Sequence, residues 1–597
     1  MRARLSLAIV LTLALGVLPA RAKPAPDGGA SGKLDRALQN DVQNDPGHRQ
    51  RIIVRVRPGA GAVIRQILEQ QGGDVTGEYP GLHAITGDAS GSQIQQLAGD
   101  SSVVSISSDP VVQALGAVRW RSAFRPRHIK PGAPSTLRAT LGLPGAVDPI
   151  DPDGALTGAG VGVALIDSGL APSPDFNGRI TAFFDLTHGG MRATYPYDDF
   201  GHGTQVAGLI GSSGVLSDGE YQGIAPNVHF AVFKVLDQNG QGLTSWVVQA
   251  LEYVTAHKDE LGVQVVNLSL GHPILEPAAS DPLVQAVENA VHAGLVVVTA
   301  AGNFGTNPTT HQTGYAGITS PGNAPDAITV GAVTTQNTVT RDDDRVAPYS
   351  SRGPTWYDGY AKPDVVAPGT DVVSDAASNS SLLKQLTKNH VKAVTGRLFL
   401  SLTGTSMATG VASGVVALMI EAHHRVAAGT GAPALAPSLV KAMLEYSAIP
   451  VRDDQAQPFD ALTQGTGQVN AAGATQLAGA VDTSNTGAGW LVAPFTPYTV
   501  IGGETLAWAQ NIVWGSNIVW GALFDSNQPA WAQNIVWGGN IVWGGNIVWG
   551  GNIVWGGNIV WGSNIVWGAN IVWGSNIVWG NNIVWGGNIV WGGNVEF

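Results

Sequence analysis

Two short apolar runs that end in polar residues constrain the fold of this chain most. Residues 161–166 lead directly into Asp167, and residues 297–301 lead into Gly302 and Asn303. Short apolar runs of this kind predict strands that are buried on both faces, as in a parallel sheet covered by helices. Open α/β sheets place their sites at the carboxyl ends of such strands. We therefore expect an α/β domain with Asp167 at its site and a second buried strand that ends in Gly302 and Asn303.

Two further polar residues lie among glycines and small residues. His202 stands between Gly201 and Gly203, before a stretch that predicts a loop entering a closely packed helix. Ser406 precedes residues 407–418, which are almost all small or apolar and predict a buried helix. The first N–H groups of a helix lack internal partners and favour nearby negative charge. Ser406 therefore offers a hydroxyl group together with a free N–H group.

Asp167, His202 and Ser406 together make a nucleophilic site. A serine hydroxyl needs a base to take its proton and a carboxylate to orient that base. Each residue alone also has a structural explanation, because Asp167 fits a turn, a lone His is often structural, and Ser406 fits a helix cap. Their combination in one chain favours catalysis over these explanations.

The motifs that carry these three residues resemble those of a known family. Asp167-Ser168-Gly169, Gly201-His202-Gly203-Thr204 and Gly404-Thr405-Ser406-Met407-Ala408-Thr409 are similar to the motifs of subtilases, the subtilisin-like serine proteases of peptidase family S8. The resemblance covers roughly residues 50 to 480. It implies a subtilisin-like three-layer domain with a mainly parallel sheet. It also implies that Asn303 is the side-chain donor to the oxyanion.

The resemblance further implies residues that bind a peptide substrate by strand addition. Ser269, Leu270 and Gly271 resemble the strand that lines the primary specificity pocket. The edge strand that pairs with an extended peptide is expected at Gly240, Gln241 and Gly242. Small residues at Ala300, Ala301 and Gly302 leave room for a sizeable side chain before the scissile bond.

Three features depart from the family pattern. Gln205 stands where a second His is common, and Gly410 stands where Pro is usual, which we expect to loosen the start of the Ser406 helix. Residues 375–400 form an unusual insertion whose basic residues place it on the surface. It is interpreted as a tolerated loop, with control of substrate entry as the alternative.

The chemistry requires no cofactor, and we expect no metal among the site residues. A structural calcium ion is compatible with the resemblance, although residues 211–220 lack the expected Asn-rich loop. Asp342, Asp343 and Asp344 form an acidic cluster that is interpreted as a solvated turn. The net charge of −12 argues against a nucleic-acid partner.

The ends of the chain predict export and processing. Residues 1–22 have the basic start, apolar run and small-residue end of a secretory signal peptide, and the absence of Cys excludes disulfides. Residues 23–50 predict a disordered linker. Residues 51–115 resemble an α+β pro-domain that templates folding and inhibits the site until it is removed, with an independent accessory domain as the alternative. A basic linker at 116–135 is expected to contain the maturation site, between about residues 113 and 140.

The catalytic domain is expected over residues 136–480, followed by a linker at 481–510 and a Trp-rich repeat at 511–597. The repeat holds twelve copies of Asn-Ile-Val-Trp-Gly, ten of them at an unbroken six-residue period. On a helix, six residues advance by about 600°, so successive Trp side chains would point in different directions. An even period keeps them on one face of a strand. We expect a β-rich region and hypothesise a β-solenoid. A low-complexity, aggregation-prone tail is the alternative, and a random-coil circular-dichroism spectrum of the isolated segment would contradict the solenoid.

The leading functional hypothesis is a secreted serine endopeptidase, made as a self-processing zymogen and either extracellular or retained at the cell surface. It would act on proteins or peptides and would be inhibited by its own pro-domain. A peptide ligase or single-target maturation protease would use the same site. The alternative of a different class is a surface-associated binding or structural protein that contacts polysaccharide or the cell surface through its Trp repeat, with protease activity limited to self-processing or one target.

Overall fold

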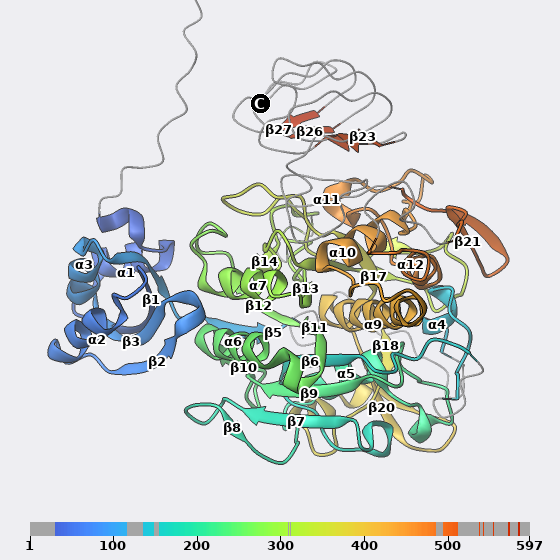
Figure 1. The fold of residues 1–597 in the computed structure, drawn as a ribbon, viewed down its shortest axis with the longest axis horizontal. Helices are drawn as coiled ribbons and strands as arrows, with labels where there is room; N and C mark the ends of the chain where they lie inside the picture. The colour runs from blue at the N-terminus through green and yellow to red at the C-terminus, as the bar shows by residue number, and fades with distance from the viewer. Residues whose placement is uncertain are drawn as a thin grey trace, which may run out of the picture.

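The computed structural model describes residues 30–115, 135–148, 154–307, 310, 312–484 and 493–510, together with five short strands of the repeat. The expected signal peptide (residues 1–22) and almost all of the basic linker lie outside the described residues. Figure 1 shows a small N-terminal unit, in blue, beside a larger α/β unit, with β5 of the N-terminal part reaching into the larger unit.

The N-terminal unit is a four-stranded antiparallel sheet, in the order β2-β3-β1-β4, packed against helices. Side chains alternate across the central strand β1, so Ile52 and Val54 belong to the core of this unit and Ile53 packs against the larger unit. The elements in chain order are η1 (Ala30–Lys33), α1 (Arg36–Asn44), β1 (Arg49–Val56), α2 (Gly61–Gln70), β2 (Val75–Tyr79), η2 (Pro80–Leu82), β3 (Ala84–Ser90), α3 (Gly91–Gly99), β4 (Val103–Ser108) and β5 (Val111–Ala114).

Helical structure is present within the expected linker at residues 23–50. Residues 30–50, expected to be part of a disordered linker, contain η1, α1 and the start of β1. Asp35 caps α1 by accepting a hydrogen bond from Leu38 N, and Leu38 and Val42 are buried on the inner face of the helix. The periodic apolar residues of α1 therefore outweigh the polar composition around them.

The larger unit is built on a nine-stranded sheet whose central strands are all parallel. Only the short strands β8 and β16 pair with it in the antiparallel sense. In order across the sheet the strands are β16 (Arg345–Val346), β15 (Ile328–Thr334), β13 (Val296–Ala300), β11 (Val263–Leu268), β6 (Gly162–Asp167), β9 (His229–Lys234), β7 (Ile180–Asp185) and β8 (Arg192–Ala193), with β17 (Val365–Pro368) also beside β15.

Helices cover both faces of this sheet and make three layers (Figure 1). Val163 and Leu165 of β6 pack into the cluster formed with one set of helices, while Ala164 and Ile166 pack into the other. This arrangement confirms the expected α/β domain with a mainly parallel sheet. One face carries α5 (His202–Gly211), α9 (Thr405–Thr430), α10 (Pro437–Tyr446) and α12 (Ala471–Ala478), and the other carries α6 (Thr244–Leu261) and α7 (Pro282–His292).

Helix α9 is the central helix of the domain. Residues Thr405–Gly429 are long and apolar enough to cross a membrane, but the apolar window is entirely buried inside the protein, as in the core helix of a globular domain. At Gly410 an added Cβ atom would lie 3.2 Å from both Cγ1 and the carbonyl oxygen of Val206. Gly410 therefore allows α9 and α5 to pack closely.

The insertion at residues 375–400 packs against the loop that carries His202. Backbone N–H groups of Ser381 and Leu382 donate to the carbonyls of Asp199 and Phe200, at 2.8 and 2.9 Å. Its four basic side chains are exposed, as expected, while Leu382 is buried, so the insertion is only partly a surface loop. It follows β18 (Val372–Ser374), contains α8 (Ser381–Gln385), η5 (Thr387–Asn389) and β19 (His390–Lys392), and ends within β20 (Leu398–Leu402).

Part of the expected linker at 481–510 also folds onto the domain. A hairpin of β21 (Tyr498–Ile501) and β22 (Glu504–Ala507) brings Trp508 into a buried position. The indole N–H of Trp508 donates to Thr499 Oγ1 at 2.8 Å, and its ring stacks on Phe495. The aromatic pair therefore extends the domain to about residue 510. Smaller elements are α4 (Leu137–Thr140), η3 (Pro174–Phe176), η4 (Val215–Ser217), β10 (Gln241–Leu243), β12 (Leu270–Pro273), β14 (Thr319–Ser320) and α11 (Ala461–Gln464).

In the repeat, β24 to β27 pair in parallel with equivalent positions opposite one another, whereas β23 pairs antiparallel with β24 and places Trp537 opposite Ile541. Ile541 lies opposite Ile553, Ile553 opposite Ile571, and Ile571 opposite Ile583, all in parallel pairs. The offsets of 12, 18 and 12 residues are multiples of the six-residue period. The strands are β23 (Val536–Trp537), β24 (Ile541–Val542), β25 (Ile553–Val554), β26 (Ile571–Trp573) and β27 (Ile583–Trp585).

Candidate active site

Asp167 and His202 form a buried acid–imidazole pair. Asp167 is the last residue of β6, and His202 is the first residue of α5. The Nδ1 atom of His202 lies 2.7 Å from Asp167 Oδ1, and both side chains are almost fully excluded from solvent. Because Nδ1 contacts the carboxylate, Nε2 is the ring nitrogen that can accept and donate a proton. Within the described residues, His202 Nε2 has no hydrogen-bond partner.

Ser406 is the second residue of α9 and lies at its amino end. Its hydroxyl donates to the carbonyl oxygen of Ser269 at 2.9 Å, and the Ser269 hydroxyl donates to the carbonyl oxygen of Ser406 at 3.0 Å. In this arrangement the Ser406 proton points at Ser269 rather than at His202.

Asn303 follows β13 and is oriented by the residue before Ser406. Its side-chain oxygen accepts hydrogen bonds from Thr405 N at 3.0 Å and Thr405 Oγ1 at 3.1 Å. With the oxygen held in this way, the amide nitrogen faces outward. That nitrogen donates to the backbone carbonyl oxygen of Leu115 at 2.7 Å.

Leu115 ends an extended segment that lies between two strands of the larger unit. β5 pairs antiparallel with β10 on one side and with β12 on the other. Ala114 N donates to Gly240 O at 3.1 Å, and Leu115 N donates to Ser269 O at 3.2 Å. The N-terminal part thus occupies the groove between β10 and β12 as an added middle strand.

The structure places the predicted substrate-binding residues in two groups. Six of them border the β5 segment, namely Gly240, Gln241, Gly242, Ser269, Leu270 and Gly271. At Gly271 an added Cβ atom would lie 3.3 Å from a methyl group of Leu115.

Ala300, Ala301 and Gly302 lie behind Asn303. Ala300 and Ala301 are fully buried, and Ala301 N donates to Val330 O on β15 at 3.0 Å. Gly302 has φ +105°, which favours glycine, and its N–H donates to Thr405 Oγ1 at 3.2 Å. These residues shape the turn that presents Asn303.

Asp198 is a buried organising residue that the sequence reading missed. Its carboxylate accepts hydrogen bonds from Ser168 Oγ (2.9 Å), Gly201 N (2.7 Å) and both the N–H (2.8 Å) and hydroxyl (2.7 Å) of Thr204. Burial raises the pKa of Asp198, and these hydrogen bonds oppose the rise. The carboxylate ties the strand end at Asp167 to the start of α5. In the sequence, the signal that could have identified Asp198 is a carboxylate a few residues before the Gly-His-Gly motif.

Lys234 supports the same region from β9. Its ammonium group is fully buried and donates to Ser168 O at 2.8 Å, Leu236 O at 2.8 Å and Asp199 Oδ1 at 2.6 Å. A buried ammonium group is stable only with such partners. Its contacts fix the backbone next to Asp167, so Asp198 and Lys234 both position the Asp167–His202 pair.

The N-terminal unit also covers carboxyl groups of the larger unit. Glu252 Oε1 accepts a hydrogen bond from Leu82 N at 2.9 Å, and burial raises the pKa of Glu252 to about 7. Glu276 lies in the segment that Arg36 N contacts through Leu275 O at 3.2 Å. Burial raises the pKa of Glu276 to about 8, and the charge of Asp281 adds to this effect.

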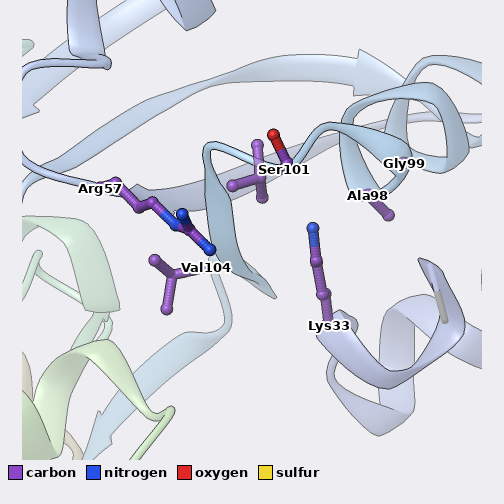
Figure 2. A pocket seen from close by; sticks show the side chains of 7 residues that line it. Lys33, Arg57, Ala98, Gly99, Ser101 and Val104 are labelled. Atoms are coloured by element: carbon purple, nitrogen blue, oxygen red, sulfur yellow. The ribbon is translucent and has the colours of Figure 1, made fainter. Parts of the chain in front are cut away.

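A cavity of about 520 Å³ lies on the N-terminal unit and contains none of the predicted site residues (Figure 2). Lys33 extends toward it, and its ammonium donates to the carbonyl oxygen of Asp100 at 2.6 Å. The cavity is lined by Lys33, Arg57, Ala98, Gly99, Ser101, Val103 and Val104. It is therefore separate from the groove that holds Leu115.

The acidic cluster at 342–344 does not gather as a calcium site. Asp344 is buried beside Arg341, 4.0 Å away, and burial raises the pKa of Asp344 to about 7. Asp343 instead accepts a hydrogen bond from Thr338 Oγ1 at 2.8 Å. Asp344 is thus a buried partner of Arg341, which corrects the expected solvated turn.

The chain is similar in sequence to known serine proteases. The chain is 38% identical over 321 residues to the serine protease AprX of Bacillus subtilis, covering 53% of this chain and 66% of that protein. It is 34% identical over 273 residues to subtilisin of Bacillus pumilus, covering 45% of this chain and 79% of that protein. Subtilisin E of Bacillus subtilis is also 34% identical over 273 residues. That match covers 45% of this chain and 57% of subtilisin E.

The fold and the family are shown by two further matches. The crystal structure of fervidolysin from Fervidobacterium pennivorans, described as a keratinolytic enzyme related to subtilisin, aligns with a TM-score of 0.51 at 21% identity, covering 72% of this chain and 61% of that one. The family model of the subtilase family matches residues 158–489. Because this match covers more than half of the 597 residues, the chain belongs to the subtilase family.

Proposed function

We propose that this protein is a serine endopeptidase that processes itself at the Leu115–Gly116 bond and then cleaves other proteins. The observation that carries the proposal is the position of the Leu115 carbonyl. Its oxygen accepts the Asn303 amide, while β5 pairs with a strand on each side of the groove. A peptide that pairs as an added strand, and whose carbonyl oxygen accepts a hydrogen bond from a side-chain amide, is positioned as a protease substrate.

The proposed reaction assigns one step to each side chain. The Ser406 hydroxyl turns from Ser269 O toward His202 Nε2, gives up its proton, and attacks the Leu115 carbonyl carbon. Asn303 Nδ2 and the Ser406 N–H group hold the resulting oxyanion. His202 then donates its proton to the leaving amine of Gly116, and Asp167 stabilises the imidazolium in between. Water hydrolyses the acyl-enzyme by the same groups.

The N-terminal unit is proposed to act as an inhibitory pro-domain. Ile53, Tyr79, Leu82 and Ala84 pack into the cluster that contains α6 and α7. Asp109 adds polar contacts, because its carboxylate accepts hydrogen bonds from Ser245 N at 2.8 Å and Ser245 Oγ at 2.7 Å. After cleavage these contacts would hold the product in the groove. Export as a zymogen is proposed from the signal-like residues 1–22.

The experiment that tests the proposal is N-terminal sequencing and intact-mass analysis of the purified, processed wild-type protein. We expect a new N-terminus at Gly116 and hydrolysis of casein once residues up to 115 have dissociated. A processed protein with a different new N-terminus, or one that does not cleave any protein after the pro-domain is removed, would contradict the proposal.

We expect the pro-domain to dissociate more readily as the pH rises. Covered Glu276 and Glu252 have pKa values raised to about 8 and about 7, and these fall toward the ordinary value near 4.5 when water returns. Protonated carboxyls therefore favour the complex, and this contribution is lost as the pH rises through the raised values. Between pH 6 and pH 9 we expect roughly a ten-fold or larger loss of affinity.

Gel filtration of the cleaved complex at pH 6 and pH 9 measures this effect. The charges that face Glu276 are Asp281, Asp35 and Arg55, and they remain in the matched variant Glu276→Gln. We expect this variant to retain the pro-domain at pH 9 much better than the wild type. Equal retention at both pH values by the wild type would show that these groups do not control release.

For the repeat, we infer a β-solenoid. The supporting observation is the parallel pairing of equivalent Ile positions at offsets that are multiples of six. In such a stack the Trp residues of successive coils form a ladder, which is a surface suited to polysaccharide or a cell surface. The circular-dichroism measurement on residues 511–597 tests this inference.

A further inference from the structure

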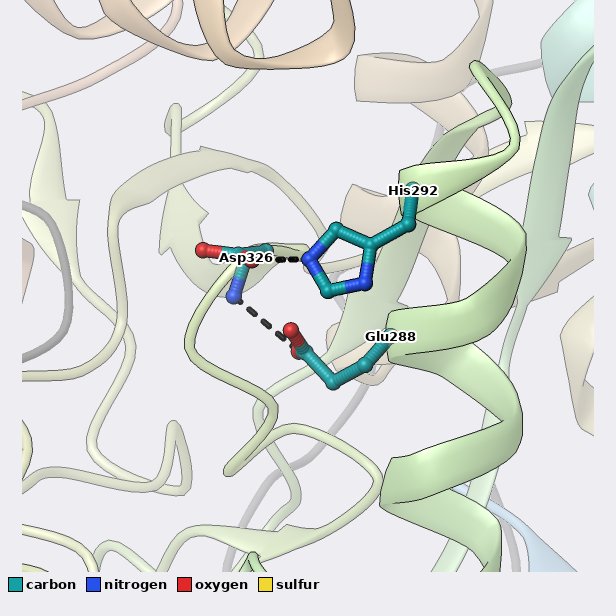
Figure 3. A group of neighbouring side chains, drawn as sticks. All are labelled: Glu288, His292 and Asp326. Carbon is teal, nitrogen blue, oxygen red and sulfur yellow. Dashed lines mark hydrogen bonds and ion pairs between the residues drawn. The ribbon is translucent and has the colours of Figure 1, made fainter. Parts of the chain in front are cut away.

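Three side chains of metal-binding type converge near the carboxyl end of α7 (Figure 3). Glu288 and His292 are four residues apart on α7, so they project from the same face of the helix. Asp326 comes from the loop that precedes β15. Each residue offers one ligand atom, and these atoms all lie within 4.8 Å of one another.

The distances suit a small divalent ion. The Nε2 atom of His292 and the Oδ2 atom of Asp326 are 3.3 Å apart. Two ligand atoms on tetrahedral zinc, with bonds of about 2.0–2.1 Å, are separated by about 3.3 Å. Glu288 Oε1 accepts a hydrogen bond from Asp326 N at 3.1 Å, which holds the third ligand beside the other two.

The site is open to solvent on the side of His292, and buried charged side chains lie behind it. The His292 side chain is 57% exposed, while that of Asp326 is 11% exposed, so an ion can enter past the imidazole. Behind the cluster, the ammonium groups of Lys362 and Lys441 lie 2.8 and 3.1 Å from the carboxylate of Asp364.

Charged groups of both signs surround the cluster. Glu445 also acts on both buried lysines, and Lys441 faces Asp326 in addition. Two ammonium groups are thus matched by two other carboxyl groups, Asp364 and Glu445. Asp326 therefore faces Lys441 as well as His292, and the charge of Lys362 acts on Glu288.

We propose that Glu288, His292 and Asp326 bind a divalent transition-metal ion of the zinc class, which fastens α7 to the loop before β15. One imidazole nitrogen and two carboxylate oxygens suit such an ion, whereas calcium takes six to eight oxygen ligands. With three protein ligands, water completes the tetrahedral shell. The site is separate from the Asp167–His202 pair and takes no part in peptide cleavage.

Isothermal titration of the full chain with zinc chloride tests the proposal. The chain carries Ser406→Ala in every sample so that it stays uncleaved. We expect one tight site that His292→Ala and Glu288→Gln each weaken at least ten-fold, in the range of the losses measured for metal sites. Glu288→Gln keeps an oxygen that can accept from Asp326 N, so its fold should be retained. Zinc should raise the unfolding temperature only where the site is intact.

His257→Ala is the matched control. His257 also pairs with a carboxylate, since its Nδ1 atom is 3.1 Å from Glu260 Oε2 on α6, but among the described residues this pair has no third metal-binding side chain beside it. We expect this variant to bind zinc as the parent chain does. X-ray absorption of the bound zinc should show one imidazole with oxygen ligands. Absence of tight zinc binding by the parent chain, or equal binding by the parent, His292→Ala and Glu288→Gln chains, would overturn the proposal.

Discussion

Replacing Ser406 with alanine should abolish both self-cleavage and turnover of other proteins. The change removes one hydroxyl group, which donates a hydrogen bond to Ser269 O. No other group at this position could then attack the Leu115 carbonyl. In a subtilisin, loss of the nucleophile lowers turnover by about a million-fold. We expect a loss of that order here, measured with casein and by the mass of the purified chain.

The matched control is Ser413→Ala on the same helix. Ser413 is also fully buried, and its hydroxyl donates to Asn267 Oδ1 at 3.0 Å. Loss of this hydrogen bond should cost about 1 kcal/mol of stability and leave processing intact. If purified Ser406→Ala still releases residues up to 115, then Ser406 is not the nucleophile.

The second large effect is expected at Asn303. Asn303→Ala removes the amide that donates to Leu115 O, and loss of one oxyanion donor typically costs about 10² to 10³ in turnover. The loss should appear mainly in kcat, because the negative charge develops only in the transition state. Steady-state kinetics on a peptide substrate measure the two parameters separately.

Asn303→Asp sharpens this test. An aspartate can still accept the two hydrogen bonds from Thr405, so the loop should keep its shape. It places an oxygen where the oxyanion would form, and turnover should fall at least as far as in Asn303→Ala. Asn177→Ala, at an exposed position, serves as the control. Activity of Asn303→Ala near the wild-type level would remove Asn303 from the oxyanion hole.

Much of the candidate site could be predicted from local sequence. The run before Asp167 and the run before Asn303 are apolar and short, which identified two buried strands and their polar ends. The small residues after Ser406 identified a buried helix. Such patterns are local because strand and helix periodicities are set by neighbouring residues.

Other features depended on contacts between distant segments. Asp198 and Lys234 look like ordinary charged residues in the sequence, yet both are buried at the site by strands and loops that fold around them. Residues 36–44 lie in a polar stretch, but the helix there is stabilised by burial of Leu38 and Val42 against the rest of the unit.

The sequence by itself identified the groups of the proposed chemistry: an acid, an imidazole, a hydroxyl and an amide, each at the end of a predictable element. Only the tertiary structure decided what lies against them. It placed the Leu115 carbonyl on Asn303, and it brought Asp326 to Glu288 and His292. The physical reason is that secondary structure follows from residues within a few positions, whereas these contacts join segments that are far apart in the chain and meet only when the sheet and its helices pack together.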